Sequence, residues 1–387
     1  MSRVLLGSDV LVDRQLVRGR TIGLVSNPAS IDGQFRHIAD RLDAGGVRIG
    51  ALFGPQHGFR SDVQENMIES PHATDARRRV PVYSLYSETR EPTAEMLAGL
   101  DALVIDLQDV GTRIYTYIYT MAYCLRAARA SGLPVIVCDR PNPIGGVAVE
   151  GPMLEAGFES FVGLYPIPMR HGMTIGELAR LFNEHFGIGA KLEVVKIEGW
   201  SRAQYADETG LPWVLPSPNI PTLETAMVYP GTVLFEGTLV SEGRGTTRPF
   251  EIIGAPGLEP ESTAADLNRR GLPGVHFRPV VFEPTFHKHA NAACGGCQIH
   301  VTDRGAFRPV ETGVAVIEAI RSAHPGAFRW REPPYEYERA KPPIDILYGS
   351  AALREGLESG ATAADLARGW AATLGPFLET RARFLQY

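Results

Sequence analysis

The segment ALVIDL, residues 102–107, decides the fold because it is apolar at nearly every position. A strand with one solvent-exposed face alternates apolar and polar residues, whereas a strand covered on both faces is apolar at nearly every position. A second run of this kind, PVIVC at 134–138, follows a helical pattern at 117–130. Strand, helix and strand in this order predict two parallel strands joined by a crossover helix.

The same alternation extends outward over the first part of the chain. Further strands are expected at 21–26, 47–53, 80–85 and 192–197, and helices at 34–42, 92–100 and 174–186. Thr174 and Glu177 are spaced as a capping box at the start of the last helix. Pro and Gly make 140–152 (RPNPIGG) a predicted loop, and WVLPSPNIP at 213–221 another.

The pattern changes after Ser262 to pairs of strands with helices between them. Strands are expected at 275–282 and 297–303, and helices at 312–322 and 362–374. The chain of 387 residues is longer than one core usually spans, so we expect two domains, 1–258 and 259–387, with a boundary near Pro256–Ser262.

Composition limits the classes of partner. The formal net charge of −6 argues against nucleic acid or an anionic membrane as the main partner. No apolar run approaches the ~20 residues of a membrane-spanning helix. The run Val4–Leu6 is too short for the core of a signal peptide, which predicts a cytoplasmic protein. The sequence does not indicate an oligomeric state.

Motifs for cofactors and metals are missing from the sequence. No G-x-G-x-x-G follows the first strand, and neither a P-loop nor a G-x-S-x-G occurs. Cys124 and Cys138 lie in apolar runs and are expected to be buried thiols. Cys294 and Cys297 form a C-x-x-C without a second ligand pair, so we interpret Cys294–Cys297 as a turn before a strand. No cofactor and no metal are therefore expected.

Polar residues recur where successive predicted strands end. The carboxyl ends of parallel strands meet at one edge of a sheet, where ligands bind. The residues that follow or end these strands are Asn27, Gln56, His57, Arg60, Asp106, Gln108, Asp109, Arg113, Asp139, Arg140 and Asn142. Some of them, Asp139 above all, could equally serve as helix caps.

Paired carboxylates suit this edge best. Glycoside hydrolysis needs a protonated acid for the leaving oxygen and a second group that stabilises or attacks the cationic sugar carbon. Each acid taken alone could be a solvated or capping group. The acids in loop-like contexts are Asp62, Glu65, Asp106, Asp109, Asp139, Glu150, Glu236 and Glu242.

Several long strings together resemble one family. GPQHGFR, VIDLQDVGTRIYTYIYTM, FVGLYPIPMRHGMTIGELA, WVLPSPNIPTLETAMVYPGT and EGTLVSEGRGTTRPFEIIGAP are similar to the exo-β-N-acetylmuramidase family, and the likeness runs to the final RFL at 383–385. The resemblance implies a Rossmann-like α/β domain with a parallel sheet, a smaller C-terminal α/β domain and a site between them. It also implies cofactor-free release of N-acetylmuramic acid from the non-reducing end of peptidoglycan fragments, so that the partner is a small carbohydrate or muropeptide.

One position departs from the family. The family usually reads P-E-H-G where this chain has Pro55-Gln56-His57-Gly58. An amide cannot donate a proton as that glutamate would. One interpretation is that another carboxylate, for which Glu65 is our candidate, takes its role. Alternatively, orientation of the substrate by amide and carboxylate groups suffices, or the chain binds sugar without cleaving it. A further alternative is a hydrolase of another N-acylated or acidic sugar.

The remaining roles are assigned as hypotheses. Glu65 is the expected acid, with His57 and Gln56 beside it. Arg113, Arg140 or Arg244 could hold the lactyl carboxylate, or each could form a structural ion pair. Asn142 and Asn219 could hold the N-acetyl group, and Tyr117 could wall a sugar subsite. The full set of expected substrate contacts is Asn27, Arg60, Asp106, Asp109, Arg113, Tyr117, Asp139, Arg140, Asn142, Asn219, Glu242 and Arg244.

Overall fold

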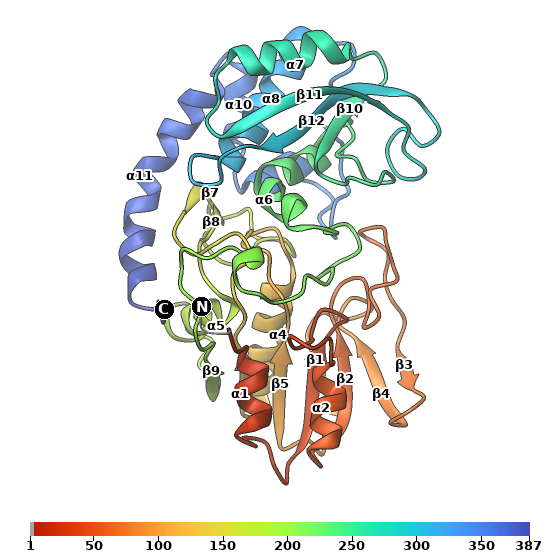
Figure 1. Ribbon diagram of the computed structural model, residues 1–387, viewed down its shortest axis with the longest axis vertical. Coiled ribbons are helices and arrows are strands. Elements are labelled where there is room, and N and C mark those ends of the chain that lie inside the picture. The colour runs from red at the N-terminus through yellow and green to blue at the C-terminus, as the bar shows by residue number, and fades with distance from the viewer. Residues whose placement is uncertain (1–3) are drawn as a thin grey trace.

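The computed structural model describes residues 4–387 and has two lobes (Figure 1). The lower lobe contains a seven-stranded sheet of order β3-β4-β2-β1-β5-β6-β9, parallel except for the edge pair β3·β4. Its strands are β1 (Thr21–Ser26), β2 (Arg48–Gly54), β3 (Ala73–Asp75), β4 (Val80–Ser84), β5 (Ala102–Asp106), β6 (Val135–Cys138) and β9 (Leu192–Val195).

Helices cover this sheet, and β5 is buried at all five positions because both of its faces are packed. The helices are α1 (Gly7–Asp13), α2 (Ile38–Ala44), α3 (Ala94–Leu97), α4 (Tyr117–Ala130) and α5 (Ile175–Arg180), which continues as a π-helical turn (Leu181–His185). The expected α/β fold with a parallel sheet is confirmed. The capping box of Thr174 and Glu177 at the start of α5 is confirmed too.

The upper lobe is built on the antiparallel sheet β10-β12-β11. Its elements are α6 (Leu223–Thr232), a 3₁₀ turn (Val233–Gly237), β10 (Ile252–Ala255), α7 (Pro260–Arg269), β11 (Val275–Phe282), β12 (Cys294–Val301), α8 (Pro309–Ala323), α9 (Pro343–Tyr348), α10 (Ala352–Glu358) and α11 (Ala363–Ala382). β10 lies before the expected domain boundary in the sequence but pairs with β12, which lies after it. The boundary at 256–262 stays a prediction.

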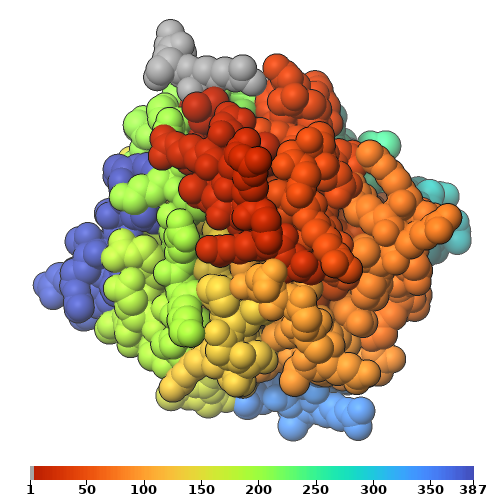
Figure 2. All heavy atoms as spheres, turned by 90° about the horizontal axis from the view of Figure 1, so that it is seen from below, coloured from red at the N-terminus to blue at the C-terminus, as the bar shows by residue number. Residues whose placement is uncertain are grey.

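The two lobes are tied together at their side. Helix α11 runs down from the upper lobe to the lower one (Figure 1). Seen from below, the lower end of the molecule is made mostly of N-terminal residues, with blue C-terminal residues at its edge (Figure 2). The last residue reaches the sheet, because the Tyr387 hydroxyl donates to Asp139 Oδ2 at 2.6 Å. A single hydrophobic core contains residues of both lobes, among them Val25 and Phe277, so their relative position is fixed by packing.

Three local predictions were wrong. The Cys294–Cys297 segment belongs to β12 rather than to a turn, because its glycines admit close strand packing: a Cβ on Gly296 would lie 2.0 Å from the carbonyl oxygen of Ile253. The helix expected at 34–42 begins only at Ile38, since the chain before it turns back on itself through the bridge Ile31↔His37. The loop expected at 140–152 ends early, because a two-stranded sheet of β7 (Glu150–Met153) and β8 (Pro168–Arg170) starts within it.

Candidate active site

A narrow cavity lies between the lobes at the carboxyl ends of the parallel strands, and we call it the Glu336 cavity. Its walls combine the loops after β2 and β5 with the 3₁₀ turn of the upper lobe and a hairpin at 335–338. The lining residues used below are Gln56, His57, Asn66, Tyr117, Asn219, Glu236, Arg244, Tyr335 and Glu336.

The upper lobe presents Glu336 at the tip of a tight turn. Tyr335 and Glu338 exchange both main-chain hydrogen bonds at 2.9 Å, which leaves Glu336 and Tyr337 as the two central residues. Both have positive φ, 43° and 70°, in the left-handed region that favours Gly or Asn. Such strain is typical of functional positions, where the surrounding structure holds a side chain in place.

The lower lobe receives this carboxyl with two donors. Gln56 Nε2 donates to Glu336 Oε1 at 3.1 Å, and the Tyr86 hydroxyl donates to Oε2 at 2.8 Å. Burial, aided by the nearby charge of Glu236, raises the pKa of Glu336 to about 7. The carboxyl therefore carries its proton over much of the neutral range, as a general acid requires.

Two other carboxyls have a raised pKa without lining this cavity. Burial raises the pKa of Asp139 and of Glu150 to about 7 as well. Asp139 accepts hydrogen bonds from Thr174, Gly176 and Tyr387, and Glu150 caps the amide of Glu311. Their position within the scaffold singles out Glu336 as the acid that a ligand can reach.

A second carboxylate faces the same cavity and is held rigidly. Glu236 Oε1 accepts from Arg244 Nη2 at 2.7 Å, and Oε2 accepts from the Tyr335 hydroxyl at 2.6 Å and from Asn66 Nδ2 at 3.0 Å. The guanidinium of Arg244 is its counter-charge. Glu236 is thus held by three hydrogen bonds beside a protonated Glu336.

Several buried polar atoms of the cavity wall have no hydrogen-bond partner among residues 4–387. They include Asn66 Oδ1, an acceptor, and Arg244 Nη1, a donor. Buried polar groups are nearly always paired, so orphans of this kind in a cavity wall are suited to a polar ligand. A sugar with an amide N–H and a carboxylate supplies both missing partners.

His57 is held as a neutral ring. Its Nδ1 lies 2.7 Å from the carbonyl oxygen of Val63, which assigns the proton to Nδ1 and leaves Nε2 as an acceptor. Burial and the charge of Arg244 lower the pKa of His57 to about 4. The residue has φ 71°, a second strained position on the cavity wall.

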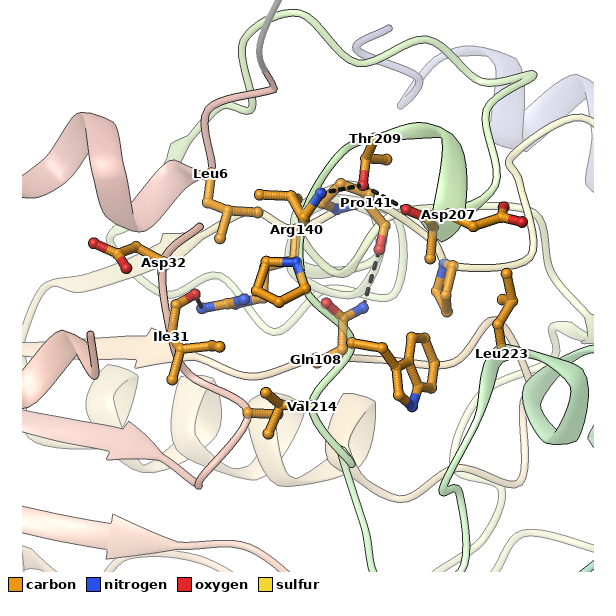
Figure 3. Close-up of a pocket in the computed structure, with 16 residues that line it drawn as sticks. Leu6, Ile31, Asp32, Gln108, Arg140, Pro141, Asp207, Thr209, Val214 and Leu223 are labelled. Atoms are coloured by element: carbon orange, nitrogen blue, oxygen red, sulfur yellow. Dashed lines mark hydrogen bonds between the residues drawn. The ribbon is translucent and has the colours of Figure 1, made fainter. Parts of the chain in front are cut away.

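A second cavity of about 280 Å³ lies at the same edge of the sheet, and we call it the Arg140 cavity (Figure 3). Its charged side chains are already paired. Arg140 contacts Asp106 through two hydrogen bonds, Asp32 binds Arg36, and Asp207 binds Arg304. Most of its wall is apolar, with Leu6, Ile31, Val214 and Leu223 facing the space. It therefore lacks an available acid.

The expected site residues divide between the two cavities. Gln56, His57, Tyr117, Asn219 and Arg244 line the Glu336 cavity, whereas Arg140 lines the other with Asp106 bound behind it. Glu65 is half-buried on the loop that carries Asn66, but it lines neither of these two cavities. Arg60 is exposed beyond both.

Other expected substrate contacts are occupied within the protein, and we assign them structural roles. Arg113 is fully buried and donates to four main-chain carbonyls, of Pro152, Ile167, Leu347 and Tyr348. Glu242 is bound by Lys288 at 2.7 Å and supports Arg244 from behind. Four further residues also bond within the protein. Asn27 bonds Tyr117 and Pro216, and Asp109 bonds Gly111 and pairs with His171. Asp139 bonds the amide of Gly176, and Asn142 bonds Met173.

Sequence reasoning missed Glu336, Asn66 and Tyr335. Glu336 lies in EPPYEYE, residues 332–338, far from any predicted parallel strand. Its partner Gln56 is 280 residues away, so no local pattern connects them. A signal was present, because an acid between two tyrosines after two prolines is unusual for a solvated loop.

Metal ligation receives no support from the part of the chain that the structure describes. Residues 4–387 contain no group of three or more His, Cys, Asp or Glu side chains placed to hold a metal ion. Within the same residues, no helix is both long and apolar enough to cross a membrane.

Comparison with known proteins covers the whole chain. Family models described as exo-β-N-acetylmuramidase NamZ, N-terminal and C-terminal, match residues 22–224 and 227–387. The peptidoglycan β-N-acetylmuramidase NamZ of Bacillus subtilis (strain 168) is 47% identical over 388 residues, which cover 100% of this chain and 92% of that protein.

Two crystal structures of proteins described as members of the DUF1343 family, both from Bacteroides fragilis NCTC 9343, have the same fold. One has a TM-score of 0.89 at 34% identity, and the other a TM-score of 0.77 at 26% identity. Each comparison covers 100% of this chain and 99% of the other.

Proposed function

Since the chain belongs to the exo-β-N-acetylmuramidase NamZ family, we propose that it is a glycosidase that releases N-acetylmuramic acid from the non-reducing end of peptidoglycan fragments, with Glu336 as the proton donor. The observation that carries the assignment of the acid is the position of Glu336: a protonated carboxyl at a strained turn, bridging the lobes and lining the cavity beside an ionised Glu236.

The proposed mechanism needs only groups of this chain. Glu336 protonates the glycosidic oxygen as the bond to the sugar carbon breaks, while the Glu236 anion stabilises the positive charge that develops on the ring. His57 Nε2, an unprotonated acceptor, receives a proton from a hydroxyl or from the attacking water. Gln56 keeps Glu336 in place, because its amide oxygen is held by the Thr116 hydroxyl at 2.8 Å.

Arg244 is the residue we propose for the lactyl carboxylate. Of the three arginines considered from the sequence, it alone lines this cavity, and Nη1 is unused. A guanidinium edge matches a carboxylate. Asn66 Oδ1 would accept the N-acetyl N–H.

Entry of a sugar ring requires the cavity, about 40 Å³ as it stands, to widen. The loop of residues 55–70 is the part proposed to move. The hydrogen bond from Asn219 Nδ2 to the carbonyl oxygen of Gln64 at 2.8 Å ties it to the 213–220 segment, and the bonds from Gln56 to Glu336 and from Asn66 to Glu236 tie it to the upper lobe.

The proposed partner is a small carbohydrate or muropeptide, with neither nucleic acid nor membrane as a target. We also propose a cytoplasmic location. Four free cysteines, Cys124, Cys138, Cys294 and Cys297, fit a reducing compartment.

Release of sugar from defined glycosides tests the activity. Purified protein should release free N-acetylmuramic acid from the disaccharide in which this sugar is β-linked to N-acetylglucosamine. Cleavage of the corresponding glucosaminide, which lacks the lactyl group, should be slower by about ten-fold or more. Binding of the disaccharide without any release would contradict the hydrolase, and equal rates for the two glycosides would contradict the role of Arg244.

A further inference from the structure

Glu336 also lines a third cavity, whose wall does not include Glu236. This cavity has a volume of about 390 Å³ and is more open than the Glu336 cavity. Its walls are formed by Glu336 together with Arg90, Tyr123, Glu159, Ser160, Phe161, Leu164, Tyr337 and Glu338. Glu336, at the tip of the strained turn, therefore lines both a narrow cavity and a wider one.

From this arrangement we infer that the wider cavity holds the leaving side of the substrate, the N-acylated pyranose joined to the departing oxygen. The inference rests on the proposed function, since it takes Glu336 as the proton donor. The oxygen that receives the proton must lie within hydrogen-bond reach of this carboxyl, with the two sugars on opposite sides of it. Two cavities that share Glu336 in their walls fit that requirement.

The walls suit a neutral sugar ring. Phe161, Tyr123 and the half-exposed ring of Tyr337 supply apolar faces, and the Tyr337 ring packs against Tyr86 and Phe161 with centroids 5.9 and 6.3 Å apart. Ligand pockets of 300–1,000 Å³ with aromatic walls and a few polar groups typically take one small molecule or sugar unit.

Arg90 supplies hydrogen-bond donors, and the other polar residues of the wall besides Glu336 are Glu159, Ser160 and Glu338. Its guanidinium lies 3.3 Å above the centre of the Tyr337 ring, which fixes its plane. Its Nε and Nη2 are buried and have no hydrogen-bond partner among residues 4–387, the nearest carboxylate oxygen, Glu69 Oε1, being 3.7 Å from Nη2. These donors match the carbonyl oxygen of an N-acetyl group or a pair of ring hydroxyls.

The test compares two substrates that need the same proton. The disaccharide of N-acetylmuramic acid β-linked to N-acetylglucosamine fills the wider cavity, whereas methyl β-N-acetylmuramide leaves it empty. In Arg90→Gln and in Tyr123→Leu, kcat/KM for the disaccharide should fall by about ten-fold or more, while kcat/KM for the methyl glycoside should stay within about two-fold. Arg129→Gln, on the exposed side of the same helix as Tyr123, is the matched control and should change neither.

Each outcome decides one question. Equal losses on both substrates would mean that the variants disturb Glu336 or the fold, and unchanged disaccharide cleavage would mean that no sugar occupies the cavity; either result overturns the inference. Wild-type protein that cleaves neither substrate would instead overturn the proposed function. Thermal unfolding of each variant checks that the protein is folded.

Discussion

The Glu336 cavity and the Arg140 cavity contain similar residues at the same edge of one sheet. Each has an arginine, a glutamine and an ionised carboxylate: Arg244, Gln56 and Glu236 in the first, and Arg140, Gln108 and Asp106 in the second. They differ in how much of this polarity is already used. Arg140 and Asp106 form a closed pair with two hydrogen bonds. The Gln108 amide donates to the carbonyl of Pro141 (Figure 3) and to that of Asp109.

The difference comes from the second lobe. Arg140, Gln108 and Asp106 all belong to the strand ends and loops of the parallel sheet, where they bond one another or main-chain carbonyls. In the Glu336 cavity the upper lobe contributes Glu236, Arg244 and a further carboxyl, Glu336. Not every polar atom in its wall finds a hydrogen-bond partner among residues 4–387, so some stay available to a ligand. The carboxyl ends of the strands therefore identify where a ligand can bind, whereas the acid from the upper lobe, Glu336, determines whether that ligand can be cleaved there.

Removing the acid should have the largest effect. Glu336→Gln keeps the size of the side chain but cannot donate a proton, so kcat/KM for the disaccharide should fall by about 10³-fold. N-acetylmuramyl fluoride, whose leaving group needs no proton, should be cleaved by the variant at close to the wild-type rate. Equal losses on the two substrates would show that Glu336 supports the fold of the cavity rather than protonating the leaving group.

The two arginines offer a matched pair with a smaller expected effect. Arg244→Lys keeps the charge but loses the planar fork, so kcat/KM for the muramide should fall by about 10-fold to 100-fold and its advantage over the glucosaminide should shrink. Arg140→Lys makes the same change in the other cavity, where it should lower the Tm and leave kcat/KM per folded molecule within about two-fold. Similar losses of activity in both variants would remove the distinction between the cavities.

The pH dependence tests the environment of Glu336. Because its pKa is raised to about 7 and the protonated form is the active one, kcat/KM should decline as the pH rises through about 7. Gln56→Glu would place a second carboxyl against Glu336 Oε1, and two carboxyls that share one proton hold it more tightly. The decline should then move about one pH unit upward, with only a few-fold change in the maximal rate. An unchanged profile in Gln56→Glu would assign the titration to another group.

Stability should follow a related but separate course. Glu336, Asp139 and Glu150 have raised pKa values in the folded protein, so their protonated forms stabilise the fold fully below the ordinary carboxyl pKa, and this contribution is lost as the pH rises through about 7. In Glu336→Gln the other two carboxyls remain. A decrease in Tm between pH 5 and pH 8 should therefore persist in that variant, which separates the pH dependence of stability from that of catalysis.

The sequence predicted the sheet well because its signals are local. Runs such as residues 102–105, apolar throughout, and helix 117–130 between two of them specify buried parallel strands without reference to the rest of the chain. The edge of the sheet that carries Gln56 and His57 followed from the same rule. Glu336 could not be found in this way, because its role depends on a tertiary contact across 280 residues and on a turn without the Gly or Asn that usually marks positive φ.

The smallest effect is expected for the glutamine of the Arg140 cavity. Gln108→Ala removes an amide whose two hydrogen bonds go to main-chain carbonyls of its own loops, and Asp106 and Arg140 keep their pairing without it. Activity should therefore stay within about two-fold of wild type, whereas Gln56→Ala, which removes the donor to Glu336 and the acceptor for Thr116, should lower kcat/KM by about ten-fold. If the order were reversed, the reacting sugar would lie in the Arg140 cavity. The acid would then have to come from outside it, since Asp32 and Asp207 in its wall are already bound to arginines.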